Sequence, residues 1–234
     1  MAEIIPAILE KSFDEIEEKI ALIHRIAPEV QIDICDGGFV PSKTWPLIKP
    51  PEERFEAIVA QEEGMPFWED CDFEFDLMVK DPIHHVADFI ALGANRIVVH
   101  DKSASDEEIE KILHEYNAPE SAFSEFDIAV GVAIHHDTSD ERMKKLAGIA
   151  AYVQFMGIKN VGFQGQGFDE DVLARIKLLR KEFPELIISV DGGVNEENIS
   201  ALVEAGADRL IVGSAIWESE TPADTLEHLQ KLAQ

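Results

Sequence analysis

The chain has 234 residues, and its 47 acidic side chains outnumber its 20 basic ones, which gives a formal net charge of −27. This excess of acid argues against nucleic acid and against an anionic membrane surface as partners, because both require clustered Lys and Arg. Hydrophobic residues make up 46% of the chain and charged residues 29%, a balance typical of a globular protein with a large core. We therefore expect one domain that spans residues 1–234.

The sequence shows neither a targeting segment nor a membrane segment. The first residues, Met1–Pro6, lack the basic region and apolar stretch of a secretory signal. No apolar run approaches the ~18 residues that span a bilayer. The two cysteines, Cys35 and Cys71, are too few for a disulfide framework. We expect a reduced, cytoplasmic protein.

Strand-like and helix-like segments alternate along the whole chain. Apolar runs rich in Val and Ile predict eight strands, at Glu3–Leu9, Val30–Cys35, Phe73–Met78, Arg96–His100, Ile128–Ala133, Ala151–Met156, Leu186–Asp191 and Arg209–Val212. Amphipathic patterns between them predict helices at Phe13–Ile26, Glu52–Gln61, Pro82–Leu92, Ser105–Tyr116, Ser139–Leu146, Asp169–Phe183, Asn195–Ala205 and Thr221–Ala233. Such continuous apolar strands are typical of a parallel sheet that is buried on both faces.

Eight successive strand–helix units predict a closed (β/α)8 TIM barrel, whose usual length of ~250 residues is close to that of this chain. The competing architecture, a doubly wound open sheet, usually has glycines directly after its first strand, where this chain has Glu10-Lys11-Ser12. Gly93 and Gly206 each follow a predicted helix and precede a strand. We expect both to end their helices in a left-handed conformation.

Three acidic residues lie at the ends of predicted strands, where a barrel carries its chemistry. Asp33, Asp76 and Asp191 have apolar neighbours, and a buried carboxylate is costly unless it is paired, hydrogen-bonded or bound to a metal. We interpret all three as candidate site residues. The alternative is that each carboxylate caps the turn that follows its own strand.

Glycines follow three consecutive predicted strands. Barrels commonly bind phosphate with the loops after strands seven and eight, where backbone N–H groups face the anion. Such a site holds phosphate without Lys or Arg, which suits an acidic protein. The candidate phosphate-binding residues are Gly162, Gly165, Gly192, Gly193, Gly213 and Ser214.

These residues, in this order, resemble the ribulose-phosphate 3-epimerase family over nearly the whole chain. The most specific stretch is Asp33-Ile34-Cys35-Asp36-Gly37-Gly38-Phe39-Val40-Pro41, close to the family's Asp-x-Met-Asp-Gly-His-Phe-Val-Pro. The other matching stretches are Ile5-Pro6-Ala7-Ile8-Leu9, Asp76-Leu77-Met78, Met156 with Gly162-Phe163-Gln164-Gly165-Gln166, Val190-Asp191-Gly192-Gly193 and Gly213-Ser214-Ala215-Ile216. The resemblance implies a (β/α)8 barrel and an isomerase of the pentose phosphate pathway that interconverts ribulose 5-phosphate and xylulose 5-phosphate.

The resemblance also implies roles for the acidic residues. Asp33 and Asp191 match the family's acid and base, which also hold a divalent metal together with two His. Those two His are replaced here by Gln31 and Asp76. The implied metal ligands are therefore Gln31, Asp33, Asp76 and Asp191, an all-oxygen set that favours Mg or Mn over Zn. A metal-free site, with Asp76 as a polar group of the substrate pocket, is an open alternative.

Other positions near the site also differ from the family pattern. Ala7 replaces a substrate-binding Ser, and Cys35 replaces the first of the family's methionines. Met78 and Met156 are kept, and we expect them to form an apolar wall beside the substrate. His135 and His136 replace Asn-Pro after the fifth strand, as donors to sugar hydroxyls or as metal ligands. For His100 we favour a hydrogen-bonded structural role.

Three other functions match parts of the same pattern. A non-catalytic barrel would keep the phosphate site as a sensor or scaffold, and an epimerase could act on a related ketose phosphate such as allulose 6-phosphate. Related barrel decarboxylases and aldolases need Asp-x-Lys-x-x-Asp at the end of strand three, whereas here Asp76 and Lys80 are four residues apart. In each case the expected ligand is a small-molecule sugar phosphate. The sequence is also compatible with a homo-oligomer.

Overall fold

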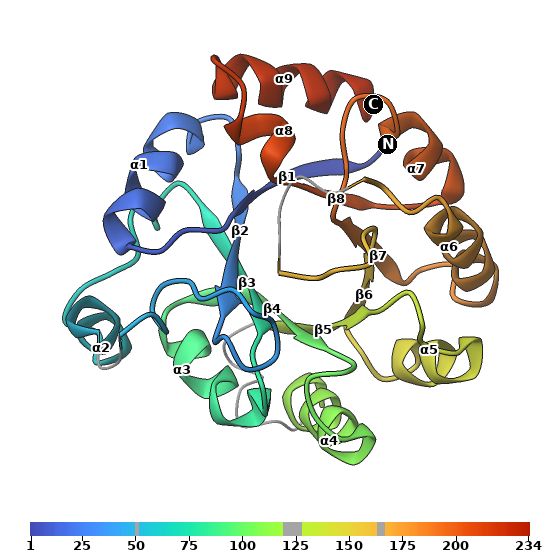
Figure 1. Ribbon diagram of the computed structural model, residues 1–234, viewed down its shortest axis with the longest axis horizontal. Helices are drawn as coiled ribbons and strands as arrows, with labels where there is room; N and C mark the ends of the chain where they lie inside the picture. Colours follow the sequence, from blue (N-terminus) through green and yellow to red (C-terminus); the bar gives the residue numbers. More distant parts are fainter. Residues whose placement is uncertain (50–51, 119–127, 163–166) are drawn as a thin grey trace.

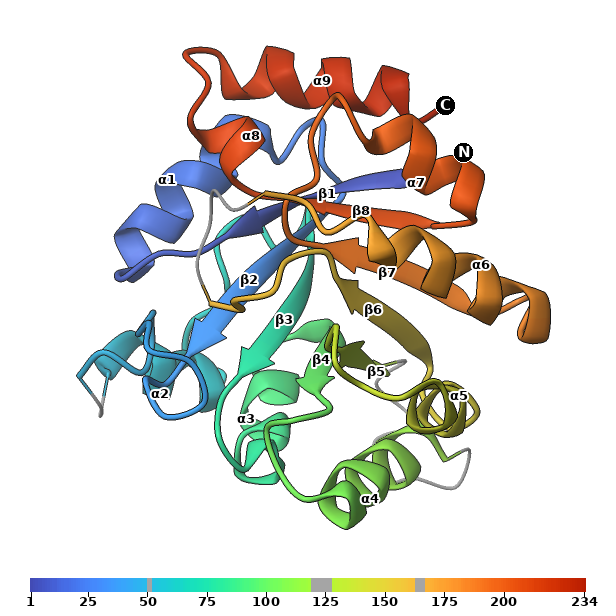
Figure 2. The ribbon, with the colours of Figure 1, turned by 45° about the vertical axis from the view of Figure 1, so that its right-hand side comes forward.

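The computed structural model describes residues 1–49, 52–118, 128–162 and 167–234, and it confirms the predicted barrel. Parallel strands pair in chain order, and β1 closes the ring against β8 (Figure 1). The turned view in Figure 2 shows the helices packed outside this ring. The strands are β1 Glu3–Ile8, β2 Glu29–Cys35, β3 Asp72–Met78, β4 Ala94–His100, β5 Ala129–Ile134, β6 Tyr152–Met156, β7 Ile187–Asp191 and β8 Arg209–Val212.

The helices follow the predicted order, and several begin with side-chain caps. Ser12 and Ser105 each form a capping box with a Glu three residues later, and Ser139 accepts a hydrogen bond from Arg142 N. Gly93 and Gly206 have φ angles of +94° and +106°, so the predicted left-handed helix ends are confirmed. The helices are α1 Phe13–Ile23, α2 Glu53–Val59, the 3₁₀ helix η1 Pro82–His84, α3 Val86–Ala91, α4 Asp106–Asn117, α5 Asp140–Ala147, α6 Asp171–Glu182, α7 Ile199–Ala205, α8 Ser214–Trp217 and α9 Pro222–Leu232.

Three helical segments differ from the prediction. The expected helix Pro82–Leu92 is split into η1 and α3, because His85 N donates to Pro82 O in a 3₁₀ turn. Helix α7 begins four residues later than expected, since the Asn195 and Asn198 side chains bind backbone N–H groups of the preceding turn. The four-residue helix α8 was not predicted. In the described part of the chain, no helix has both the length and the apolar character needed to cross a membrane.

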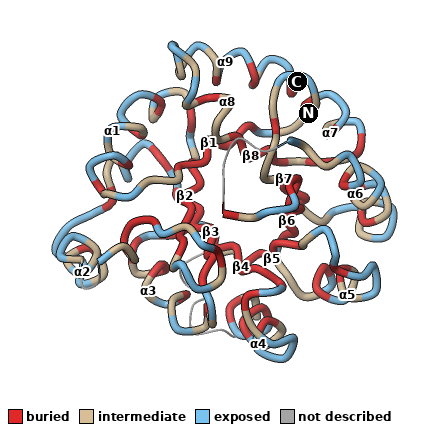
Figure 3. Tube along the Cα trace, in the orientation of Figure 1, coloured by how far each residue is buried: buried red, intermediate tan, exposed pale blue. Residues whose placement is uncertain are grey.

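The strands separate an apolar outer layer from a polar interior. Side chains such as Ile32, Phe75 and Ile97 belong to the main core cluster between the strands and the helices. Figure 3 shows the buried ring of strands and the exposed outer faces of the helices. The buried polar residues of the strands are Gln31, Asp33, Glu74, Asp76, His100, Gln154, Ser189 and Arg209. Most barrels fill this interior with branched apolar side chains, so its polarity here calls for a chemical explanation.

Two of these residues, Glu74 and Arg209, belong to a buried ion cluster at the N-terminal end of the barrel. Arg209 Nη2 contacts the Glu74 carboxylate and lies 2.8 Å from Glu29 Oε1. The Tyr152 hydroxyl donates to Glu74 Oε1 at 3.1 Å. Gly131 makes room for the tyrosine ring, because a Cβ at this glycine would lie 2.5 Å from Tyr152 Cζ. The cluster pairs its charges inside the protein.

The register between β3 and β4 shifts by one residue near the start of the two strands. Phe73 pairs with Ala94, whereas Glu74 pairs with Arg96, so Asn95 is an extra residue in β4. After this shift, alternate residues of β4 point into the barrel. Arg96 lies over the Tyr152 ring, Val98 packs in an inner cluster with Tyr152, and His100 reaches Asp76. The shift therefore determines which face of β4 supplies the interior.

Candidate active site

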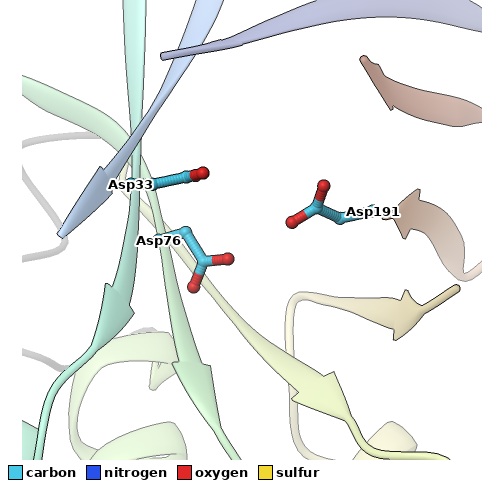
Figure 4. A group of neighbouring side chains, drawn as sticks. All are labelled: Asp33, Asp76 and Asp191. Atoms are coloured by element: carbon cyan, nitrogen blue, oxygen red, sulfur yellow. The ribbon is translucent and has the colours of Figure 1, made fainter. Parts of the chain in front are cut away.

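Three carboxylates converge at the C-terminal end of the barrel. Asp33 and Asp76 are register partners on β2 and β3, and Asp191 ends β7 on the other side of the barrel mouth (Figure 4). Each offers an oxygen, and these three oxygens all lie within 4.8 Å of one another. The structure thus brings together the three acidic residues that the sequence singled out.

Gln31 links two of these carboxylates. It points into the barrel two residues before Asp33 on β2, and it is completely buried. Its Nε2 donates to Asp33 Oδ1 at 2.9 Å and to Asp191 Oδ2 at 3.4 Å. Its Oε1 is buried and has no hydrogen-bond partner among the described residues. The amide therefore bridges the proposed acid and base, and it keeps one oxygen available.

Asp76 receives its own pair of donors. His100 Nε2 lies 2.7 Å from Asp76 Oδ1, and Gln154 Nε2 donates to Asp76 Oδ2 at 3.1 Å. The hydrogen-bonded role predicted for His100 agrees with this contact, whereas Gln154 was not among the predicted site residues. A signal was present, because Gln154 is a polar residue between Val153 and Phe155 in an otherwise apolar strand.

The surroundings of Asp33 and Asp191 favour their protonated forms. Burial raises the pKa of Asp33 well above its ordinary value, and the charges of Asp191 and Asp76 raise it further. Burial and the charge of Asp76 raise the pKa of Asp191 to about 7. In the described part of the chain, no Lys or Arg forms an ion pair with any of the three. Near neutral pH the Asp33–Asp191 pair therefore holds a proton that an ordinary carboxylate would have lost.

A pocket opens beside this pair. Its lining residues are Ala7, Leu9, Asp33, Met78, Met156, Ile158, Gly162, Asp191, Gly192, Gly193, Val194, Ile211, Gly213 and Ser214. It thus unites the predicted acid–base residues, both predicted methionines and most of the predicted phosphate-binding residues. Gly165 lies outside the described residues, and the pocket wall does not include Gln31 or Asp76.

The loops after β7 and β8 form one side of the pocket. Gly192 and Gly193 have φ angles of +102° and +71°, a conformation that glycine adopts readily. A Cβ at Gly193 would lie 2.9 Å from Phe168 Cα. After β8, Gly213 precedes α8, and Trp217 Nε1 at the end of α8 donates to Ala7 O at 2.5 Å. The Trp217 hydrogen bond places the short helix after β8 next to the first strand.

The remaining candidate residues support the rim of the site. Asp36 accepts hydrogen bonds from Gly38 N at 2.7 Å and Lys80 N at 2.9 Å, and so joins the loops after β2 and β3. His135 Nε2 lies 2.9 Å from His100 Nδ1, whereas His136 is exposed. The characteristic motif after β2 therefore contributes loop structure as well as Asp33.

Comparison with known proteins agrees with this geometry. The model of the "Ribulose-phosphate 3 epimerase family" matches residues 3–217. The ribulose-phosphate 3-epimerase of Aquifex aeolicus is 30% identical over 224 residues, which cover 93% of this chain and 90% of that protein. That of Bacillus subtilis is 28% identical over 224 residues and 93% of each chain. A solved 3-hexulose-6-phosphate synthase has a TM-score of 0.70 at 21% identity, covering 99% of this chain and 100% of that one, a likeness of fold alone.

Proposed function

Because the chain belongs to the ribulose-phosphate 3-epimerase family, we propose that it interconverts the C3 epimers of a ketose phosphate, ribulose 5-phosphate and xylulose 5-phosphate. The observation that carries this proposal is the Asp33–Asp191 pair, which converges from two sides of the barrel mouth beside a glycine-lined pocket. Epimerisation at C3 needs two such groups, because a proton leaves one face of the carbon and another arrives at the opposite face.

The chemistry follows from the acidity of the C3 hydrogen. Its removal forms an enediolate whose charge is delocalised onto the C2 oxygen. One carboxylate takes the proton from C3 and the opposite carboxylic acid returns one, and the two exchange roles when the direction reverses. Burial and neighbouring charge raise the pKa of both Asp33 and Asp191, which supplies one protonated and one ionised partner near neutral pH. Gln31 Nε2 holds the two carboxylates in place.

The acid–base pair and the polar residues around it fit a hard divalent cation. Asp33, Asp76 and Asp191 provide clustered oxygens, and Gln31 Oε1 is a buried oxygen without a partner among the described residues. Gln31 Oε1 would be the fourth ligand, and the amide would then give up its Nε2 hydrogen bonds to Asp33 and Asp191. An all-oxygen set suits Mg or Mn better than Zn. When bound, such a cation would stabilise the negative charge that develops on the C2 and C3 oxygens.

This choice of metal has its own test. The double variant Gln31→His with Asp76→His restores two imidazole ligands, and it should bind zinc more tightly than the native protein. Each single variant should change zinc affinity little, because the second imidazole is still missing. Metal content is measured by elemental analysis of the purified proteins, and zinc affinity by competition with a chelating dye. Tightly bound zinc in the native protein would contradict the oxygen-ligand proposal.

For the substrate's phosphate, we propose the backbone of Gly192, Gly193, Gly213 and Ser214, with Met78 and Met156 beside the sugar. Gly193→Asp places a negative charge at this site and a Cβ 2.9 Å from Phe168 Cα, so we expect binding of inorganic phosphate to be lost. Gly148→Asp is the matched control, since this glycine is exposed at the end of α5 and its Cβ would meet nothing closer than 3.5 Å. Calorimetry with phosphate compares the variants, and equal affinities would refute the phosphate assignment.

The arrangement after β3 favours the epimerase over a related decarboxylase or aldolase. Those reactions need a lysine between two aspartates inside the site. Lys80 is exposed instead, and its backbone N–H binds Asp36 in the loop. The described residues thus place carboxylates and amides at the reacting position, with no ammonium group among them.

The decisive experiment is an assay with ribulose 5-phosphate in deuterium oxide, with Mg, Mn, Zn or a chelator added in turn. We expect xylulose 5-phosphate to form with deuterium at C3, fastest with Mg or Mn. Allulose 6-phosphate, assayed in parallel, tests the choice of ketose phosphate. If neither substrate exchanges or epimerises while phosphate still binds, the protein is a non-catalytic sugar-phosphate binder and the proposal is wrong.

A further inference from the structure

Asp76 differs from its two neighbouring carboxylates in how it is held. Both of its oxygens receive a hydrogen bond from a side chain, His100 at 2.7 Å and Gln154 at 3.1 Å. All three residues have zero solvent exposure, and they come from β3, β4 and β6. The plane of the Asp76 carboxylate is thus set by donors from two other strands.

The donor on the β4 side is fixed in turn by a second imidazole. His100 Nδ1 lies 2.9 Å from His135 Nε2, and the Phe39 ring packs within 5.3 Å of the His100 ring. An ionised carboxylate only accepts hydrogen bonds, so His100 Nε2 carries the hydrogen. The other nitrogen, Nδ1, shares a hydrogen bond with His135 Nε2. The hydrogen bonds therefore link His135 through His100 to Asp76.

The donor on the β6 side is Gln154, and its side chain contributes little to the structure apart from this contact. Gln154 Nε2 donates to Asp76, and Gln154 Oε1 has no hydrogen-bond partner among the described residues. A buried amide that leaves one of its polar atoms unpaired does not improve stability. Its presence in an apolar strand is explained if its target, Asp76, has a function.

We propose that His100 and Gln154 are positioning residues, which lock Asp76 with one hydrogen bond per oxygen so that its remaining lone pairs face the Asp33–Asp191 pair. Each carboxylate oxygen has about two acceptor directions, so one donor per oxygen leaves one direction for a cation or a substrate hydroxyl. Outer residues orient metal-ligating carboxylates in this way, and their loss typically costs about 10–100-fold in metal affinity or activity. The proposal rests on the proposed function, since it gives Asp76 a part in that site.

Matched substitutions separate positioning from structural support. His100→Met and Gln154→Met remove the donors but keep side chains of similar length, whereas His100→Gln keeps an N–H near the position of Nε2. Val98→Ala is the control, because Val98 is the β4 register partner of Asp76 and is buried in the inner cluster. This control should lower the free energy of unfolding and leave the Asp76 carboxylate in place.

Two readouts are compared across these variants: kcat and KM with ribulose 5-phosphate, and affinity for Mn²⁺ from the electron paramagnetic resonance of the free ion. We expect His100→Met and Gln154→Met to lower kcat and Mn²⁺ affinity by about 10–100-fold, while KM stays near that of the native protein because the phosphate loops are untouched. His100→Gln should recover most of both losses, and Val98→Ala should show neither.

The outcomes also distinguish this proposal from the proposed function. If the native protein turns over no ketose phosphate, the proposed function fails, and the order of Mn²⁺ affinities still decides whether His100 and Gln154 position Asp76. Equal kcat and equal Mn²⁺ affinity in all variants would overturn the positioning roles. They would also be overturned if His100→Gln were as impaired as His100→Met, or if the native protein showed neither turnover nor Mn²⁺ binding.

Discussion

The two ends of the barrel interior bury acid in opposite ways. At the N-terminal end, Glu29 and Glu74 surround Arg209, and every carboxylate of the cluster meets a guanidinium. At the C-terminal end, Asp33, Asp76 and Asp191 meet amide and imidazole donors, and no Lys or Arg of the described residues pairs with them. Strand β3 contributes to both ends, since Glu74 and Asp76 are two residues apart on the same face.

The difference shows how charge pairing separates structure from chemistry. Burial alone would lower the pKa of Arg209, but the charges of Glu74 and Glu29 outweigh it and raise this pKa, so Arg209 stays charged. In the two aspartates a raised pKa favours the neutral form instead, because burial and neighbouring carboxylates raise the pKa of Asp33 and of Asp191. A paired buried charge is inert, whereas an unpaired one is ready to exchange a proton or bind a cation.

The largest effect is expected from the unpaired end. Asp33→Asn or Asp191→Asn removes one of the two proton-transfer groups, so turnover should fall by about 10²–10⁴-fold or more in both directions. The remaining carboxylate still reaches one face of C3. Each variant should therefore wash solvent deuterium into one epimer only, and the two variants should select opposite epimers in a nuclear magnetic resonance assay.

An exposed carboxylate provides the control for this experiment. Asp14→Asn on α1 removes the same charge from the surface and should leave turnover unchanged. Near-normal turnover in Asp33→Asn or Asp191→Asn, with the fold intact, would show that the reaction does not run through this pair.

The paired end should respond through stability. Arg209→Met leaves Glu74 without its cation, while Glu29 keeps its ion pair with Arg96, and breaking a buried pair in this way typically costs about 3–5 kcal/mol of unfolding free energy. The matched control is Arg54→Met, because Arg54 forms its ion pairs with Asp14 and Glu63 at the surface. Such exposed pairs contribute about 0–1 kcal/mol each. Urea unfolding compares the variants, and equal losses would remove the distinction between the two ends.

The smallest effect is a pH dependence that belongs to the unpaired end. The pKa of Asp191 is about 7 in the folded protein, against 3.8 for an ordinary aspartate. Between these values the folded state binds more protons than the unfolded state, so the free energy of unfolding falls as the pH rises through this window. Asp191→Asn lacks this titration, and its stability relative to the native protein should rise with pH across the same range.

The pH comparison is made with a chelator present, because a bound cation would favour the ionised carboxylate. Urea unfolding at several pH values measures the difference between the two proteins. A difference that stays constant across the window would show that Asp191 titrates normally in the folded protein.

Most of the fold could be predicted from the sequence, because each buried strand is a local apolar run and the runs recur between amphipathic helices. The family resemblance assigned Asp33 and Asp191, and the structure brings them together. The contacts of Gln154 could not be predicted, since β6 and β3 are not neighbours and their side chains meet only across the closed barrel. The Arg209–Glu74 ion pair could not be predicted for the same reason, because its two residues are far apart in the chain and meet only across the barrel.

The extra residue in β4 determines which side chains of this strand face the barrel interior. Asn95 lies between Ala94 and Arg96, the residues that pair with Phe73 and Glu74. Because side chains alternate between the two faces of a strand, deleting this one residue would exchange the inward and outward faces of every β4 residue that follows it. Ile97 and Val99 would turn inward, while Arg96 and His100 would face the apolar helix layer. Asn95, far from the barrel mouth, thus keeps Arg96 and His100 pointing into the interior at its two ends.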